Sequence, residues 1–205
     1  MPRLTLRHDS PLDAWPRNGL VVILDLEFTA WEGSLQRDWC GAEEWREIVQ
    51  VGLLLADAAD GFATVDEFEA MVRPCRRPIL SPYFSALTGI TQARLEAEGV
   101  ELAAVLPRIE GLAARAECIL FNGRDGEILR ENCELSGLTF PMPSEHMFNF
   151  RPLLARTLGR PPEELTSSNL PQLAGIVVDG HAHTALHDCR SIAASFAAWR
   201  RVDLL

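Results

Sequence analysis

The sequence predicts a single α/β domain built around a mixed sheet, and three observations favour this class. Apolar stretches of strand length are concentrated between residues 20 and 72. From residue 91 onward most apolar residues recur at helical spacing, and one more short apolar strand, Cys118–Phe121, stands between helices. With 205 residues, 47% of them hydrophobic, the chain can bury a full core without disulfides or a structural metal.

Three successive strands are expected first. Leu20–Phe28 is a nearly continuous run of aliphatic and β-branched residues, which is typical of a strand buried on both faces. Glu47–Ala56 is a second apolar strand, and Phe62–Val72 alternates apolar with acidic residues, as a strand near a sheet edge does. Because no helix separates the second strand from the third, we expect an antiparallel meander.

The segment between the first two strands, Thr29–Arg46, has no clean periodicity and contains Trp31, Trp39 and Trp45. A segment of this length without periodicity is more often a functional loop or lid than a plain connection. Its indole rings can pack onto the domain, which is the interpretation we favour for most of them, or stack on nucleic-acid bases.

The second half of the chain is expected to be mainly helical. Thr91 is expected to cap a short helix that ends at Glu98. Between Glu101 and Ala116 apolar residues recur at helical spacing despite Pro107. Further helices are expected at Asp125–Ser136, Arg151–Leu158, Asn169–Ile176 and Thr184–Trp199, with a short edge strand at Met147–Phe150.

Composition limits the class of partner and the compartment. The chain has 19 basic and 29 acidic residues, a formal net charge of −10, which argues against binding nucleic acid on a broad basic surface. An acidic, metal-filled cleft for a strand end remains compatible, because bound metal ions invert the local sign. No apolar run suits a signal peptide or a membrane span, and the five cysteines are dispersed, so we expect a soluble cytoplasmic protein. Residues 1–18 are expected to form an irregular leader before a domain at 19–205.

Acidic residues stand at the ends of several predicted elements. Asp25 and Glu27 end the first strand, and their spacing puts them on the same face. Two carboxylates side by side near a core repel each other and are costly to desolvate unless a cation lies between them. The alternative is that the strand emerges into solvent at Asp25. Asp125 follows the strand at 118–121, and His183 and Asp188 open the last helix.

An oxygen-rich cluster of this kind suits hard ions such as Mg²⁺ or Mn²⁺. Each member also has an ordinary explanation when taken singly. Asp125 can be a charge at a helix N-terminus, and His183 or His187 can be surface histidines. A zinc site made by His181, His183 and His187 is a weaker alternative, because no cysteine pair supports it.

The pattern Asp25-x-Glu27, Asp125 and His183-x-x-x-x-Asp188 resembles the DEDDh family of 3′-5′ exonucleases. This resemblance implies a ribonuclease H-like fold, with a mixed five-stranded sheet flanked by helices on both faces. It runs from about residue 21 to residue 196.

Three further stretches are similar to the Eri-like branch of that family. They are Phe68-Glu-Ala-Met-Val-Arg-Pro, Pro78-Ile-Leu-Ser-Pro-Tyr-Phe and Leu87-Thr-Gly-Ile-Thr-Gln. The chain departs from the branch at the third acid, where a Trp-Gly-x-x-Asp turn is usual and this chain has Phe121-Asn-Gly-Arg-Asp. It also has His187 and Ser191 where Asp and Asn are frequent.

The resemblance implies that two divalent cations, Mg²⁺ or Mn²⁺, are bound by Asp25, Glu27, Asp125 and Asp188. It also implies that His183 is the general base, and a histidine titrates near neutrality, as that role requires. The expected reaction releases nucleoside 5′-monophosphates from the 3′ end of single-stranded RNA or DNA or of short oligonucleotides. Since His183 and Asp188 would lie on different faces of an ideal helix, we expect His183 in the loop before it.

The same resemblance places a second set of residues beside the terminal nucleotide of the substrate. For Leu87 and Ile90 core packing is an equally good explanation. The alternative function is a catalytically weak nucleic-acid-binding module of the same fold, which a substitution at any of the five site residues would favour, and none is substituted. The expected substrate-binding residues are Phe28, Thr29, Ala30, Leu87, Thr88, Gly89 and Ile90.

Overall fold

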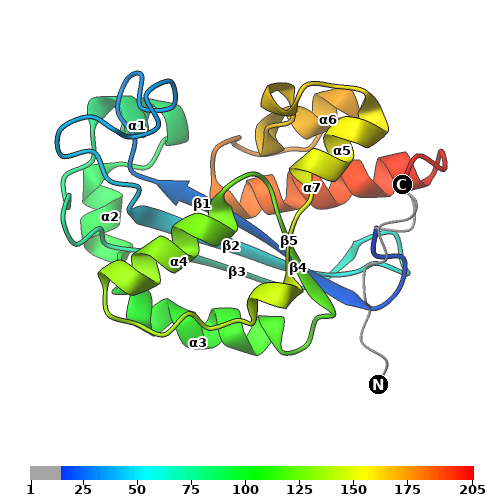
Figure 1. Cartoon of the computed structure of the whole chain (residues 1–205), viewed down its shortest axis with the longest axis horizontal. Coiled ribbons are helices and arrows are strands. Elements are labelled where there is room, and N and C mark those ends of the chain that lie inside the picture. The colour runs from blue at the N-terminus through cyan, green and yellow to red at the C-terminus, as the bar shows by residue number, and fades with distance from the viewer. Residues whose placement is uncertain (1–14) are drawn as a thin grey trace.

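The computed structural model describes residues 15–205, which form an α/β domain around one sheet (Figure 1). The strand order is β3-β2-β1-β4-β5. β1, β2 and β3 are antiparallel neighbours, whereas β4 is parallel to both β1 and β5. The expected mixed five-stranded sheet and its antiparallel meander are therefore confirmed. The strands are β1 (Leu20–Phe28), β2 (Ile48–Asp57), β3 (Ala63–Met71), β4 (Cys118–Phe121) and β5 (Met147–Asn149).

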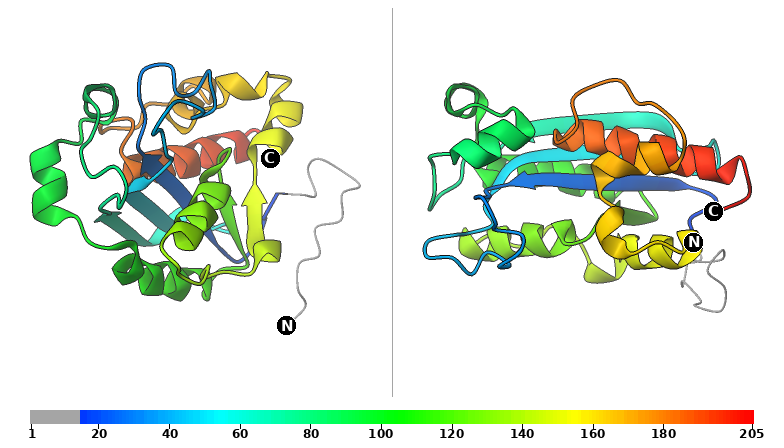
Figure 2. Two further views of the ribbon diagram at one scale, coloured as in Figure 1. Left: turned by 60° about the vertical axis from the view of Figure 1, so that its left-hand side comes forward. Right: turned by 90° about the horizontal axis from the view of Figure 1, so that it is seen from above.

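Helices cover both faces of the sheet, as expected (Figure 2). Alternate β1 residues such as Val21 and Ile23 pack with α5, α6 and α7, and the intervening Val22 and Leu24 pack with α3 and α4. The helices are α1 (Pro82–Thr88), α2 (Gln92–Glu98), α3 (Leu102–Ala113), α4 (Asp125–Leu135), α5 (Arg151–Leu158), α6 (Leu170–Leu173) and α7 (Ala185–Arg200), with 3₁₀ turns at Ser144–His146, Pro162–Glu164 and Ser167–Asn169.

Two helices differ from expectation. No helix is expected over residues 82–88 from the sequence, but α1 forms there, with Pro82 in its first turn and the Ser81 hydroxyl accepting the Phe84 N–H at 3.0 Å. The helix expected over Asn169–Ile176 is shorter, because α6 ends at Leu173 and Gly175 has a left-handed backbone with φ of +68°.

The packed core reaches back into the stretch expected to be an irregular leader. Trp15 is 2% exposed, and its ring centroid lies 4.9 Å from that of Phe196 on α7. Residues 15–18 form neither helix nor strand, and residues 1–14 of that stretch lie outside the described residues. All five cysteines carry free thiols. Within residues 15–205, no helix is both long enough and apolar enough to cross a membrane.

Candidate active site

Asp25 and Glu27 lie at the carboxyl end of the central strand β1, on the face that packs against α7. They continue the row of Val21 and Ile23, yet they are only 6% and 9% exposed. The alternative in which the strand emerges into solvent at Asp25 is therefore wrong. A register shift in the pairing with β2 follows Glu27, where the strand ends.

The N-terminus of α7 is seated directly on β2 beside these two acids. Gly52 is the partner of Asp25 in the β1–β2 register, and a Cβ at Gly52 would lie 2.3 Å from the Ala185 carbonyl carbon. Gln50, the partner of Glu27, accepts a 3.0 Å hydrogen bond from the Ala185 N–H through its side chain. The absence of a side chain at Gly52 and the hydrogen bond from the Ala185 N–H to Gln50 thus bring the first turn of α7 close to the carboxyl end of β1.

This seating brings Asp188 and His183 to Glu27. One side-chain ligand atom from each of the three lies within 4.8 Å of the others. Asp188 is 3% exposed, and His183 lies in the loop before α7 with a φ of +62°, as the helical spacing predicted. The backbone of His183 also donates a hydrogen bond to the Asp188 carboxylate.

Asp125 joins this group from the neighbouring parallel strand. It is the first residue of α4, it follows β4 closely, and it is 7% exposed. Because β4 runs parallel to β1, the carboxyl ends of both strands meet at one edge of the sheet. The negative charge of Asp125 raises the pKa of both Asp25 and Glu27. The four acids therefore act on one another as a single electrostatic group.

Burial is the main cause of the unusual acidity of these groups. It raises the pKa of Asp125 to about 8 and that of Asp188 to about 7. Burial and then repulsion from the other acids raise the pKa of Asp25 and Glu27 well above the ordinary values. Four carboxylates held this way are costly to ionise together unless a cation compensates their charge.

The residues present fit divalent cations. The Oδ1 atom of Asp188 is buried and has no hydrogen-bond partner among the described residues. A buried oxygen without a donor is rare in proteins, and a bound ion is one of the arrangements that satisfy it. The ligands are carboxylate oxygens with one nearby imidazole, a set that suits Mg²⁺ or Mn²⁺.

The three-histidine zinc alternative is not found. In the part of the chain that the structure describes, Glu27, His183 and Asp188 form the one group with metal-ligand geometry. His187 instead packs against Gly180 and lies 3.4 Å from the Ser191 hydroxyl. Burial, and then the nearby His181, lower the pKa of His183.

Two functional neighbours had no sequence signal. The Ser167 hydroxyl donates a 2.9 Å hydrogen bond to Asp25, although the two residues are 142 positions apart. The positive charge of Arg151 favours the ionised forms of Asp125 and Asp25.

The predicted substrate-binding residues of the α1 region fall into two groups. Leu87 is 38% exposed, and a Cβ at Gly89 would lie 3.5 Å from the ring of His181, in the loop that carries His183. In contrast, Ile90 is fully buried in the core, and the buried hydroxyl of Thr88 donates to the carbonyl of Phe84. Gly89 therefore lies beside the histidine loop and Leu87 is exposed, while Thr88 and Ile90 hold this segment in place.

The other predicted substrate-binding residues lie just after Asp25 and Glu27. Phe28 packs against Trp39, with ring centroids 5.4 Å apart. Thr29 is 2% exposed, and its N–H donates to the Glu47 carbonyl at 2.9 Å. Ala30 is 9% exposed, and its carbonyl accepts from the Ser81 hydroxyl.

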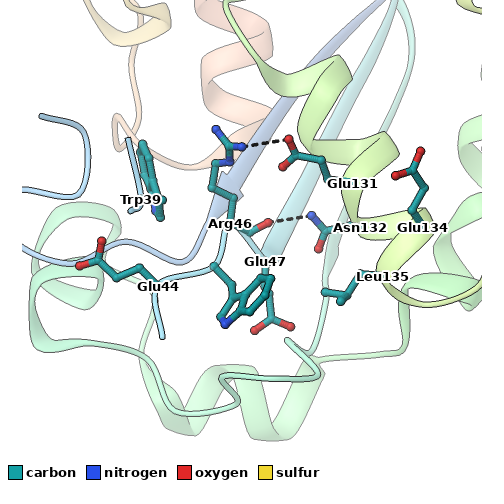
Figure 3. Close-up of a pocket in the computed structure, with 9 residues that line it drawn as sticks. Trp39, Glu44, Arg46, Glu47, Glu131, Asn132, Glu134 and Leu135 are labelled. Carbon is teal, nitrogen blue, oxygen red and sulfur yellow. Dashed lines mark hydrogen bonds and ion pairs between the residues drawn. The ribbon is translucent and has the colours of Figure 1, made fainter. Parts of the chain in front are cut away.

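The tryptophan-containing segment packs onto the domain and is tied to α4 (Figure 3). The Trp39 indole N–H donates to the Thr29 carbonyl at 2.9 Å, in accordance with the favoured packing role. Arg46 pairs with Glu131 at 2.9 Å, and the side chain of Asn132 donates to the Arg46 carbonyl at 2.7 Å. A cavity of about 450 Å³ lies between this segment and α4, lined by Trp39, Glu44, Trp45, Arg46, Glu47, Glu131, Asn132, Glu134 and Leu135.

Solved structures share this fold. The nuclease domain of 3′hExo, described as a DEDDh family member bound to rAMP, matches with a TM-score of 0.75 at 23% identity, covering 90% of this chain and 93% of that domain. Cell-death related nuclease 4 (CRN-4) matches with a TM-score of 0.71 at 18% identity, covering 91% of this chain and 65% of that one. The ribonuclease H-like fold expected from the resemblance is thereby confirmed.

Curated relatives carry exonuclease names. A 3′-5′ exoribonuclease 1 of Rattus norvegicus is 25% identical over 199 residues, covering 93% of this chain and 55% of that protein. The ERI1 exoribonuclease 2 of Danio rerio is 26% identical over 200 residues, covering 86% of this chain and 34% of its own length. The chain thus spans about half of the first relative and a third of the second. The model of the exonuclease family RNase_T matches residues 22–196, so the chain belongs to this exonuclease family.

Proposed function

We propose that the chain is a metal-dependent 3′-5′ exonuclease that releases nucleoside 5′-monophosphates from single-stranded RNA or DNA. The observation that carries the proposal is the gathering of four buried carboxylates and one histidine at the carboxyl ends of β1 and β4 and the start of α7. Membership of the exonuclease family agrees with it.

Two divalent cations, Mg²⁺ or Mn²⁺, would be held by Asp25, Glu27, Asp125 and Asp188. When bound, such cations activate a water molecule and stabilise the charge that develops on the phosphate in an in-line displacement. The carboxylates orient the reacting groups, and their burial in the domain keeps bulk water away from them.

His183 would act as the general base. Its lowered pKa keeps the imidazole neutral at neutral pH, so one ring nitrogen is available to accept a proton from water. The chain around it supports this role, since His183 lies outside the helix in a loop next to Asp188.

The substrate would be the 3′ end of a single strand or a short oligonucleotide. A neighbour with a TM-score of 0.75 is described as recognising the histone mRNA stem-loop at its 3′ end, and E. coli exonuclease I, with a TM-score of 0.65, was solved with a dT13 oligonucleotide. The net charge of −10 favours short substrates or substrates delivered by a partner. The proposed location of the protein is the cytoplasm. The exposed Leu87 and the backbone near Gly89 would meet the terminal nucleotide.

The test is a panel of 5′-labelled RNA and DNA oligonucleotides of equal sequence, incubated with Mn²⁺ or with EDTA. We expect stepwise 3′ shortening in Mn²⁺ and none in EDTA. Asp25→Asn and His183→Ala should abolish the shortening, while Asp60→Asn, which alters an exposed turn, should leave it unchanged. Binding of the oligonucleotides without shortening would instead support a catalytically weak binding module, and shortening by both site variants would reject the assigned residues.

A further inference from the structure

Three polar side chains behind the carboxylates form a chain of hydrogen bonds that ends on Asp25. Asn122 lies in the turn between β4 and α4, Arg151 is the first residue of α5, and Ser167 begins a 3₁₀ turn. Asn122 is 4% exposed and Ser167 is 9% exposed, while Arg151 is half-buried. Polar groups as buried as Asn122 and Ser167 contribute most when every donor and acceptor is matched.

Arg151, which can only donate, and the Asp25 carboxylate, which accepts, determine which group donates at each step of this hydrogen-bond chain. The Arg151 guanidinium can only donate, and its Nε donates to the Asn122 side-chain oxygen at 2.7 Å. Asn122 must then present its NH₂ group to the Leu165 carbonyl at 2.9 Å and the Ser167 hydroxyl at 3.2 Å. Ser167 accepts there, so its single proton is directed to Asp25 Oδ1 at 2.9 Å.

The Arg151 side chain has little freedom to move. A Cβ at Gly123 would lie 2.7 Å from the Arg151 Cζ atom, so the guanidinium rests directly on the glycine backbone. Gly123 has a φ of +81°, a conformation that glycine adopts without strain. The Asn149 side chain links the turn at Gly123 to the start of α5, because it accepts from the backbone N–H of Gly123 and of Arg151, each at 3.1 Å.

Arg151 acts on Asp25 through the other two side chains and not by direct contact. No ion pair within 4.0 Å joins Arg151 to a carboxylate among residues 15–205. The Arg151 guanidinium therefore occupies no oxygen of the site acids, which leaves those oxygens available to a cation.

We propose that Arg151 is a positioning residue that, through Asn122 and Ser167, holds Asp25 in the orientation needed to bind a divalent cation. The proposal rests on the proposed function, because it takes Asp25 to be a metal ligand. Groups that hydrogen-bond to metal ligands commonly fix ligand orientation and change metal affinity by about 10- to 100-fold.

The decisive experiment is calorimetric titration of Mn²⁺ into the metal-free full-length chain. Ser167→Ala should raise the Mn²⁺ dissociation constant by about tenfold, and Arg151→Met by about 10- to 100-fold. Arg151→Lys keeps a charged donor and should restore part of the affinity. Matched controls are Ser168→Ala next in the chain and Arg156→Met on the exposed side of α5, and neither should change the constant.

A second readout separates positioning from direct substrate contact. We expect Ser167→Ala and Arg151→Met to lower kcat at subsaturating Mn²⁺, while at saturating Mn²⁺ KM for the oligonucleotide and the affinity for adenosine 5′-monophosphate stay unchanged. An unchanged Mn²⁺ constant in both variants, or a weaker mononucleotide affinity with normal Mn²⁺ binding, would overturn the proposal.

Two further outcomes have to be distinguished from these results. If Arg151→Met does not fold, as judged by circular dichroism, the smaller Ser167→Ala change decides the question alone. If the wild-type chain itself binds no Mn²⁺, it is the proposed function that fails, and this result is distinct from equal binding by wild type and variants.

Discussion

The domain contains two kinds of buried carboxylate, which differ in how many hydrogen-bond donors surround them. Glu47, at the start of β2, is 1% exposed and accepts from the backbone N–H groups of Cys75, Arg76 and Arg77 at 2.7–2.8 Å. Asp188, 3% exposed, has a buried oxygen with no partner among the described residues.

This contrast separates a structural acid from a functional one. The N–H donors around Glu47 satisfy its side-chain oxygens and fasten the proline-containing segment 73–81 to the sheet. The site acids receive few donors and repel one another, which is unfavourable for folding but leaves oxygens available to a cation. Burial alone therefore does not distinguish the two kinds of acid, whereas the number of donors and the repulsion between neighbouring acids do.

The largest expected difference between the two kinds of acid is in activity. Asp188→Asn should lower mononucleotide release by about a thousandfold or more, since several kcal/mol of transition-state stabilisation depend on the bound cations. Glu47→Gln should leave kcat within about threefold, because no site acid contacts it. Single-turnover assays at saturating Mn²⁺ measure both, and equal losses would remove the distinction.

Stability should change in the reverse order. Glu47→Gln replaces an acceptor-only group facing several N–H donors, and we expect a loss of about 1–3 kcal/mol. At about 2–4 °C per kcal/mol for a domain of this size, Tm should fall by several degrees. In metal-free protein at pH 8, Asp188→Asn should instead raise Tm, because it removes a buried charge. Thermal denaturation in EDTA provides the comparison, and a lower Tm for Asp188→Asn would contradict it.

The pH dependence of stability sharpens the contrast further. In metal-free protein the pKa of Asp125 is about 8 and that of Asp188 about 7, both above the values of an unfolded chain. The stability that these two groups contribute to the free energy of unfolding is therefore fully present below about pH 4, and it is lost as pH rises through 7 and 8. Tm in EDTA should therefore fall between pH 5 and 9. Saturating Mn²⁺ should remove most of that fall, whereas the same fall with and without Mn²⁺ would argue against cation binding at these acids.

The smallest effect concerns the histidine pair. His181 lowers the pKa of His183, so His181→Asn should raise that pKa and move the acid limb of the kcat profile to higher pH. Activity at pH 8 should stay unchanged, since His183 is neutral there in either case. Full pH profiles at saturating Mn²⁺ test this, with His146→Asn, in a distant 3₁₀ turn, as the matched control.

The positions of the five proposed site residues were predictable because each stands at the end of an element with a strong local pattern. Asp25 and Glu27 follow an apolar strand run, and His183 and Asp188 stand at the start of a periodic helix. Each residue alone had an ordinary explanation, so it was their combination and its resemblance to a known family that predicted their meeting.

The supporting residues were not predictable in this way. Ser167 meets Asp25 across 142 positions and Arg151 meets Asn122 across 29, and no periodicity encodes such side-chain contacts. Helix α1 is a different case, because Ser81 followed by Pro82 is a recognisable helix start, so this helix was predictable from the sequence although it was not predicted.

The geometry of the site depends on the absence of a side chain at Gly52, where even the single methyl group of alanine does not fit. Alanine there would place a carbon 2.3 Å from the backbone of Ala185, far closer than two such atoms can approach, so the start of α7 would have to move away from the sheet. Asp188 and His183 would be carried with it, away from Glu27. Gly52→Ala would thus be an inactivating change that alters no charge, no hydrogen-bonding group and no residue that touches the substrate.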